Sequence, residues 1–265
     1  VLETVRLGNE FNVPIVARGR GTGTTGSAVP VRGGLVLSLE RMARIVDMDP
    51  ANRVMRVEPG VLNQAIQDKA AEHGFFWPPD PTSAAYCTVG GNIAVNAAGP
   101  RALKYGSTRE NVLGLVAVTG QGEEIHTGTY TTKGVVGYDL TRLIIGSEGT
   151  LAIVTEATLK LTSLPESRRT LQAVYADVRA AAAAVSRIMA QPVTPYALEF
   201  MDAQAIEMIR NYSAAELPRG AGALLMIEMD GPEAAMANVV AGVSAATRGE
   251  GLLSLAAAKT KDEAA

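Results

Sequence analysis

Short apolar runs separated by polar turns fill the first part of the chain, and this pattern predicts many short strands. A helical pattern opens the chain at residues 1–11, and an amphipathic helix is predicted over residues 61–73, ending at Gly74. Prolines within residues 77–81 exclude regular structure there. The predicted strands cover residues 13–17, 35–39, 45–48, 54–57, 112–119, 123–127 and 151–161, with a short helix or turn at residues 91–98.

After Pro165 the pattern changes to a regular alternation of strands and longer helices. We therefore expect an α+β chain of two domains, residues 1–164 and residues 165–265. The sequence opens inside a helical pattern and ends without a terminator, so we expect the first domain to be truncated at its N-terminus and the second to be partial. In the second domain the predicted strands are 170–175, 195–201, 223–229 and 252–256, and the predicted helices are 178–189, 203–209 and 232–246.

A glycine- and threonine-rich loop, RGRGTGTTG at residues 18–26, follows the first predicted strand. Residues 21–26 match the G-x-G-x-x-G fingerprint of Rossmann folds, but that fingerprint must open a helix. The stretch at 27–34, SAVPVRGG, cannot form one, so a Rossmann fold and NAD are disfavoured. Glycines let backbone N–H groups converge on an anion, and Arg18 or Arg20 would offset its charge. The loop thus predicts a phosphate site, with an ordinary flexible turn as the alternative.

Two later segments carry small and polar residues that suit a bound cofactor. Gly90 and Gly91 precede the predicted short helix, whose N-terminus would tolerate an anion. Asn92 and Asn96 lie four residues apart on one helix face, within reach of a planar ring or a ribityl chain; a packing turn of small residues is the alternative. Glu148 follows a tight turn and would accept hydrogen bonds from a ribose or hold the loop, unless it is a solvated acid in a turn.

Composition narrows the class of function. The chain has 265 residues, of which 47% are hydrophobic and 19% charged, and this favours a packed core over disorder. A net charge of −3 with scattered basic residues gives no reason to expect nucleic acid. The single cysteine, Cys87, allows neither an internal disulfide nor a cysteine-rich metal site, and it favours a reducing, cytoplasmic setting. We expect no metal, and no apolar run reaches the ~20 residues of a membrane span.

Taken in order, these segments resemble the FAD-binding domain of the vanillyl-alcohol oxidase and p-cresol methylhydroxylase (PCMH) flavoproteins. The likeness is closest to the FAD-linked subunit of bacterial glycolate oxidase and to its D-lactate dehydrogenase relatives. It implies a PCMH-type FAD-binding domain of two subdomains, followed by part of an α/β capping domain for the substrate, with helices on one side of a sheet. The stretches that carry the likeness are 13–30, 57–60, 79–99, 101–115 and 137–161.

The resemblance also implies which residues hold the cofactor. In that family the first loop holds the FAD pyrophosphate, and the later segments lie along the ribityl chain, the isoalloxazine and the adenosine. Some relatives attach the flavin to a histidine of the first loop, and residues 18–26 contain none, so the implied FAD is non-covalent. The implied cofactor-binding residues are Arg18, Gly19, Arg20, Gly21, Thr22, Gly23, Thr24, Gly26, Pro79, Asp80, Thr82, Thr88, Gly90, Gly91, Asn92, Ala94, Asn96, Ala97, Gly99, Tyr105, Glu148, Gly149 and Ile153.

By the same resemblance, the reaction is the oxidation of a small 2-hydroxy acid such as glycolate or D-lactate to the 2-oxo acid, by hydride transfer to flavin. The residues do not identify a catalytic base. The positions of His73 and His126 favour structural or surface roles, and Lys104, Tyr105 and Arg109 lie near the expected flavin segment. The expected partners are the hydroxy acid and subunits of an oxidase complex, through which a cytoplasmic protein would associate with a membrane. The alternatives are an FAD enzyme for another alcohol and a catalytically incomplete flavin-binding subunit or fragment.

Overall fold

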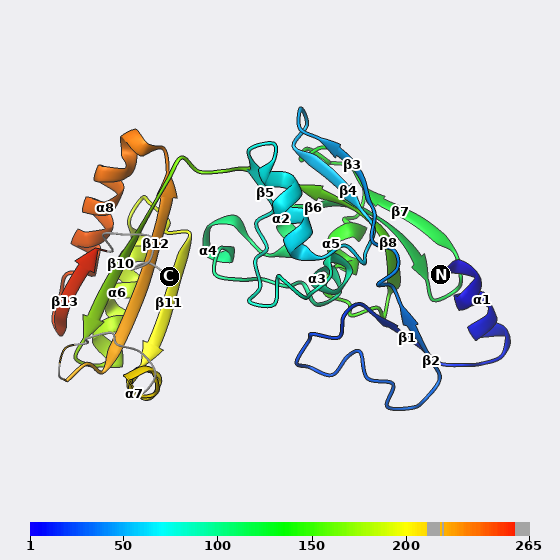
Figure 1. The fold of residues 1–265 in the computed structure, drawn as a ribbon, viewed down its shortest axis with the longest axis horizontal. Helices are drawn as coiled ribbons and strands as arrows, with labels where there is room; N and C mark the ends of the chain where they lie inside the picture. Colours follow the sequence, from blue (N-terminus) through cyan, green and yellow to red (C-terminus); the bar gives the residue numbers. More distant parts are fainter. Residues whose placement is uncertain (211–217, 219, 258–265) are drawn as a thin grey trace. The chain divides into compact units, whose positions relative to one another are not determined.

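The computed structural model describes residues 1–210, 218 and 220–257 of the chain. The chain divides into two compact units, Val1–Leu164 and Pro165–Ala265, each with its own hydrophobic core (Figure 1). The division after Leu164 falls where the sequence pattern changes.

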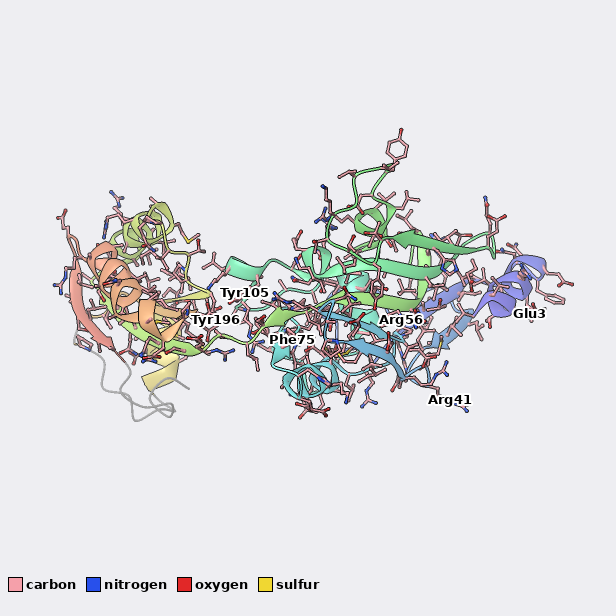
Figure 2. All side chains as sticks on the ribbon, turned by 90° about the horizontal axis from the view of Figure 1, so that it is seen from above. Glu3, Arg41, Arg56, Phe75, Tyr105 and Tyr196 are labelled. Atoms are coloured by element: carbon pink, nitrogen blue, oxygen red, sulfur yellow. The ribbon has the colours of Figure 1, made fainter. Side chains whose placement is uncertain are left out.

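A five-stranded antiparallel sheet with the order β3-β4-β8-β6-β7 forms the centre of the first unit. Successive side chains of a strand point to opposite faces, so Met55 and Val57 enter the core while Arg56 between them faces away. Arg56, labelled in Figure 2, pairs on that outer face with Glu156 at 3.4 Å. The strands are β3 (Ile45–Asp49), β4 (Val54–Val57), β6 (Val112–Thr119), β7 (Glu124–Gly128) and β8 (Ala152–Lys160).

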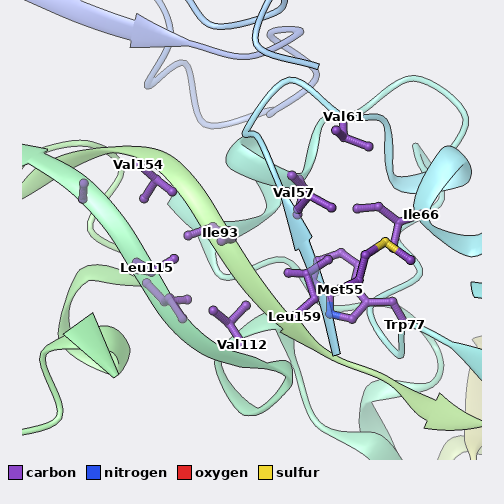
Figure 3. Packing of buried hydrophobic residues seen from close by; sticks show 14 of the residues in the cluster. Met55, Val57, Val61, Ile66, Trp77, Ile93, Val112, Leu115, Val154 and Leu159 are labelled. Atoms are coloured by element: carbon purple, nitrogen blue, oxygen red, sulfur yellow. The ribbon is translucent and has the colours of Figure 1, made fainter. Parts of the chain in front are cut away.

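The main core of this unit lies between the sheet and several short helices (Figure 3). Ile66 and Ile93 reach it from two helices, and the fully buried Trp77 joins them from the proline-rich segment. The indole Nε1 of Trp77 donates a hydrogen bond to the carbonyl of Asn111 at 3.0 Å, so the burial of this large side chain leaves no unpaired donor. The helices are α1 (Leu2–Glu10), α2 (Asn63–Ala71), α3 (Val89–Val95), α4 (Ala102–Tyr105), α5 (Leu140–Ile144) and the 3-10 turn η1 (Thr108–Asn111).

A second, smaller core packs beside the main sheet. It joins α1 and the parallel pair of strands β1 (Ile15–Arg18) and β2 (Leu35–Ser38) to the ends of β6 and β8, through Val118 and Ile153. A parallel pair needs a long crossover, which is usually a helix. Here residues 19–34 cross over without one, so the rejection of a Rossmann helix is confirmed. Two further strands, β5 (Phe75–Phe76) and β9 (Thr162–Ser163), pair outside the main sheet.

The second unit is a four-stranded antiparallel sheet with the order β11-β12-β10-β13. Helices α6 and α8 cover the face that carries Tyr175 and Leu225. Helix α7 packs through Ile206 on the opposite face, against Val174 and Leu224. Helices therefore lie on both faces, whereas the sequence predicted them on one. The elements are β10 (Ser167–Tyr175), α6 (Val178–Ala190), β11 (Ala197–Asp202), α7 (Ala203–Arg210), β12 (Ala223–Gly231), α8 (Glu233–Thr247) and β13 (Leu252–Ala257).

The predicted α+β class is confirmed, and most predicted elements are present within two residues at each end. Helix α2 is shorter than the predicted helix over 61–73, and α3 begins two residues before the predicted one. Within the described part of the chain, none of the helices combines the length and the apolar character that crossing a membrane would require.

Candidate functional site

Two adjoining hollows in the first unit form a cleft. The larger, of about 1170 Å³, lies against the glycine-rich loop after β1, and the smaller, of about 520 Å³, is mainly apolar and lies between that loop, α3 and the start of β8. Arg18, Gly19, Thr88 and Glu148 line both, so the hollows are continuous. The cleft can therefore hold an extended ligand with one apolar end.

The glycine-rich loop brings a run of free hydrogen-bond donors to this cleft. None of the backbone N–H groups of residues 20–28 donates to another described residue, and the hydroxyls of Thr22 and Thr24 have no described partner either. Gly21 has a φ of +68°, which favours glycine and lets the chain turn without a Cβ. Backbone groups without a chain partner bind water or a ligand. Consecutive free amides of this kind suit an anion with several oxygens, such as a diphosphate.

The charge of this loop is partly balanced within the chain. Arg20 Nη1 lies 3.0 Å and Arg18 Nη2 3.9 Å from the carboxylate of Glu40, which follows β2. The Ser38 hydroxyl also donates to Glu40 at 3.2 Å. Two guanidinium groups and one carboxylate leave a net charge of +1 beside the free amides. Arg18 and Arg20 therefore bring positive charge to the loop, reduced by one carboxylate that the sequence interpretation did not include, and their role toward a phosphate stays a prediction.

Close backbone packing holds the two walls of the cleft together. A Cβ on Gly19 would lie 2.3 Å from Thr88 Oγ1, and a Cβ on Gly90 would lie 2.5 Å from the Pro59 Cβ. Both distances are shorter than any ordinary contact, so these positions accept only glycine without a shift of the wall. The loop after β1 is therefore fixed against the start of α3, and the ligand surface is set by backbone.

The start of α3 does not provide the second anion site that the sequence predicted. Thr88 is the N-cap, and its Oγ1 accepts from the N–H of Gly91 at 3.4 Å. The N–H groups of Val89 and Gly90 donate to the carbonyls of Val61 and Pro59. Gly90 and Gly91 thus lie inside the first turn of the helix, with their donors already used, and that prediction is wrong. They contribute close approach of the backbone to the cleft instead.

Glu148 occupies an unusual place at the junction of the two hollows. Its φ is +54°, a left-handed conformation that costs a residue with a Cβ about 1–3 kcal/mol. The N–H groups of Gly146 and Glu148 donate to the carbonyls of Ile93 and Ala94 at 2.9 Å, which holds this turn over the end of α3. The carboxylate of Glu148 forms no hydrogen bond or ion pair with a described residue. The fold thus fixes a free carboxylate in the cleft wall.

Some predicted site residues lie elsewhere. Asn96 is the left-handed C-cap of α3, and its Oδ1 accepts from Ser107 Oγ and from the N–H of Arg109, so it does not share a helix face with Asn92. The carboxylate of Asp80 lies 2.8 Å from Arg101 Nε, so it is not free for a cofactor. The predicted residues that line neither hollow are Gly26, Pro79, Asp80, Asn96, Gly99 and Tyr105.

The other predicted residues do meet in the cleft, from three segments that are far apart in the sequence. They are Arg18, Gly19, Arg20, Gly21, Thr22, Gly23, Thr24, Thr82, Thr88, Gly90, Gly91, Asn92, Ala94, Ala97, Glu148, Gly149 and Ile153. The lining residues that the sequence interpretation missed are mostly apolar neighbours of these: Ala17, Thr25, Ser27, Ala28, Leu39, Pro59, Pro81, Ser83, Ile93, Val95, Ile144, Ser147, Ala152 and Val154. Their only sequence signal is adjacency to the motifs.

One titrating group supports the cleft from behind. Glu58, which is buried, precedes the lining residue Pro59 and accepts from Arg44 Nη2 at 2.8 Å and from the Arg44 N–H at 2.9 Å. The Arg44 guanidinium holds the pKa of Glu58 below its usual range. His73 and His126 are exposed and line neither hollow, as the sequence predicted.

Comparison with known proteins identifies the family of this chain. A family model described as an FAD binding domain matches residues 1–128, and one described as FAD linked oxidases, C-terminal domain, matches residues 164–265. The chain belongs to the FAD-linked oxidases. The resemblance seen in the sequence is confirmed, and FAD is the cofactor of this FAD-linked oxidase.

Curated relatives agree with this family. This FAD-linked oxidase is 43% identical over 256 residues to the glycolate oxidase subunit GlcD of Bacillus subtilis, an alignment that covers 97% of the chain and 54% of that protein. It is 42% identical over 204 residues to the D-lactate dehydrogenase of Archaeoglobus fulgidus, covering 77% of the chain and 45% of that protein. The chain spans about half the length of the curated relatives it matches.

A solved structure of an alkyldihydroxyacetonephosphate synthase superposes with a TM-score of 0.80 at 22% identity, over 99% of this chain and 54% of that one. At this identity the likeness shows the fold alone.

Proposed function

We propose that the cleft of the first unit binds FAD non-covalently, and that the chain is part of an enzyme that oxidises a small 2-hydroxy acid, such as glycolate or D-lactate, to the 2-oxo acid. The observation that carries the proposal is the run of free amides at residues 20–28, most of which line a hollow that adjoins an apolar one. FAD fits this combination, because a diphosphate joins its two ring systems, and the matching FAD binding domain model favours it over other dinucleotides. The relatives named glycolate oxidase subunit and D-lactate dehydrogenase supply the substrate class.

The residues of the chain have distinct tasks in this proposal. The amides of residues 20–28 and the hydroxyls of Thr22 and Thr24 bind the diphosphate, with Arg18 and Arg20 balancing its charge. Glycines at 19, 90 and 91 let the ligand approach the backbone. The apolar wall that contains Ile153 excludes water from one ring system. Bound in this way, the flavin supplies a two-electron acceptor for the hydride of the hydroxy acid.

The proposal also covers the catalytic base, the partner subunits and the cellular location. We assign no base for the hydroxyl proton to the described residues, since both histidines lie away from the cleft. The relatives named as subunits of glycolate oxidase suggest that the chain works with partner subunits in an oxidase complex. We propose a cytoplasmic location, on the sequence argument from Cys87.

Reconstitution tests the proposal directly. The purified protein is incubated with FAD, freed of excess cofactor, and examined by visible absorption; denaturation should then release all of the flavin, because none is covalently attached. Under anaerobic conditions, glycolate or D-lactate should bleach the flavin band, and L-lactate serves as the stereochemical control. Failure to retain FAD would contradict the binding proposal. Retention of FAD without bleaching by any hydroxy acid would favour a catalytically incomplete flavin-binding subunit instead.

A further inference from the structure

A buried network of side-chain amides lies directly behind the cleft wall. Asn63, the first residue of α2, is completely buried, and Asn92 on α3 is 3% exposed. Asn63 Nδ2 donates to Asn92 Oδ1 at 3.0 Å and to the Pro79 carbonyl at 3.1 Å. Asn92 lines the larger hollow, whereas Asn63 does not. The network therefore connects a residue outside the cleft with one in its wall.

Backbone groups determine which atoms of this network donate and which accept, because a backbone N–H can only donate and a carbonyl can only accept. The N–H of Trp77 donates to Gln67 Oε1 at 3.3 Å, and the Trp77 carbonyl accepts from Gln67 Nε2 at 2.7 Å. Gln67 Nε2 also lies 3.3 Å from Asn63 Oδ1, so the nitrogen of Asn63 must be the atom that faces Pro79 and Asn92. The prolines around Trp77 hold this segment in its irregular course.

The consequence is that the amide of Asn92 has only one orientation. Its oxygen is held by Asn63, and one of its N–H groups donates to the sulfur of Cys87 at 3.3 Å. An amide nitrogen carries two N–H donors, and the second has no acceptor among the described residues. A donor left without a partner at a nearly buried position costs about 1–3 kcal/mol unless a ligand or water accepts from it.

We infer that Asn63 is a positioning residue for the cofactor, which acts by fixing the Asn92 amide so that one N–H is presented to an acceptor oxygen or nitrogen of bound FAD. This inference rests on the proposal that FAD occupies the cleft. Without Asn63, the Asn92 amide can rotate by 180° and present its carbonyl oxygen, which repels the same acceptor. Asn63 thus determines whether Asn92 presents a donor or an acceptor to the cofactor, although Asn63 does not itself contact the cofactor.

Affinity for FAD in three variants tests the inference. Asn63→Leu keeps the side-chain size and removes both donors, and Asn92→Leu removes the presented N–H. Each should weaken FAD binding roughly three- to tenfold, the effect of one hydrogen bond. Because both lose the same contact, the double variant should bind no more weakly than the weaker single variant. Losses that multiply, or an unchanged dissociation constant in Asn63→Leu, would overturn the inference.

Gln67→Met is the matched control. It removes hydrogen bonds from the same helix to the same segment, and also the bond from Gln67 Nε2 to Asn63 Oδ1. The Pro79 carbonyl accepts only from the nitrogen of Asn63, so Asn63 and the Asn92 amide keep their orientation. We expect a lower melting temperature with FAD affinity within twofold of wild type. An equal loss of affinity in this control would show that Asn63 acts only through general stability, and the inference would fail.

A spectroscopic measurement decides the matter if Asn63→Leu does not fold. In wild-type protein labelled with ¹⁵N-asparagine, the Asn92 side chain gives two N–H resonances, identified by their absence from the Asn92→Leu protein. FAD should shift one strongly and leave the one bound to Cys87 nearly unchanged; equal shifts, or none, would contradict the inference. A wild-type protein that binds no FAD would overturn the proposed function as well, whereas FAD binding without these effects overturns the inference alone.

Discussion

Substitution of Gly19 by alanine tests whether close packing of β1 against α3 forms the cleft. The new Cβ would lie 2.3 Å from Thr88 Oγ1, 3.6 Å from Thr88 Cβ and 3.7 Å from the Gly91 nitrogen. Ordinary van der Waals contact begins near 3.4 Å, so the hydroxyl must retreat by about 1 Å. Gly19 is not in the left-handed region, and backbone strain therefore adds nothing to this clash.

The cost follows from what the hydroxyl does. Thr88 Oγ1 caps α3 through the Gly91 N–H at 3.4 Å, a distance that allows no further retreat. Loss of an N-cap costs about 1 kcal/mol, and overpacking adds about 1–3 kcal/mol. A total of roughly 2–4 kcal/mol corresponds to a fall in melting temperature of roughly 4–16 °C for a unit of this size. Because the loop moves away from α3, we expect FAD affinity to fall about tenfold.

Thermal unfolding and FAD titration measure both effects. Gly120→Ala is the control, since a Cβ there would meet nothing within 4 Å, and its stability should stay within about 0.5 kcal/mol of wild type. Adding Thr88→Ala to Gly19→Ala removes the clashing oxygen, so the double variant should lose less stability than the sum of the single losses. Additive losses, or a Gly19→Ala protein with wild-type stability and affinity, would refute the packing argument.

Three further substitutions probe the supports around the cleft and the second unit. Glu58→Gln should lower the free energy of unfolding by about 1–2 kcal/mol at pH 7. Arg44 lowers the folded pKa of Glu58, so the contribution of Glu58 to stability is present above the unfolded value of about 4.3 and is lost as the pH falls through the folded pKa. Urea unfolding should therefore show the difference between wild type and variant shrinking as the pH is lowered below the unfolded pKa. Arg101→Met breaks the partly buried pair with Asp80 and should cost about 1–2 kcal/mol in the same assay; an unchanged midpoint would show that the pair is energetically silent. Tyr175→Phe leaves the buried Thr247 carbonyl unpaired and should lower the melting temperature of the second unit without changing FAD affinity.

Hydrophobic periodicity was enough to predict the architecture, because both units follow simple burial patterns. In β12, alternate residues such as Leu225 and Ile227 enter one core while Leu224 enters the other. The continuous apolar run at residues 223–227 predicts a strand buried on both faces. The placement of α7 on the face opposite α6 could not be predicted, since it depends on which face of the sheet the connecting segments reach. Element ends shifted by one or two residues where caps such as Thr88 override the apolar period.

Some features of the site follow from the local sequence, and others depend on contacts between residues far apart in the sequence. The glycine-rich loop was predictable, because free amides without a following helix are a local property of residues 18–34. The sequence did not reveal that Arg101, Ser107 and Arg109 bind the side-chain oxygens of Asp80 and Asn96, whose cofactor contacts stay predictions. Such partners are near in space and not recognisable from the sequence pattern. A polar residue in a cofactor motif therefore predicts a site contact only when no other chain group can satisfy it.

Few charged side chains of the cleft stay available to a ligand, because partners within the chain already bind most of them. Arg18 and Arg20 are already paired with Glu40, and the helix N-terminus at Thr88 is already capped within the chain. What stays available is backbone N–H from residues 20–28, one N–H of Asn92 and the carboxylate of Glu148. The base of the loop at Gly19, the backbone of Glu148 and the Asn92 amide are held by packing or hydrogen bonds within the chain. Binding then requires little reordering of the walls, so FAD affinity should depend more on substitutions that move these walls, such as Gly19→Ala, than on removal of either arginine.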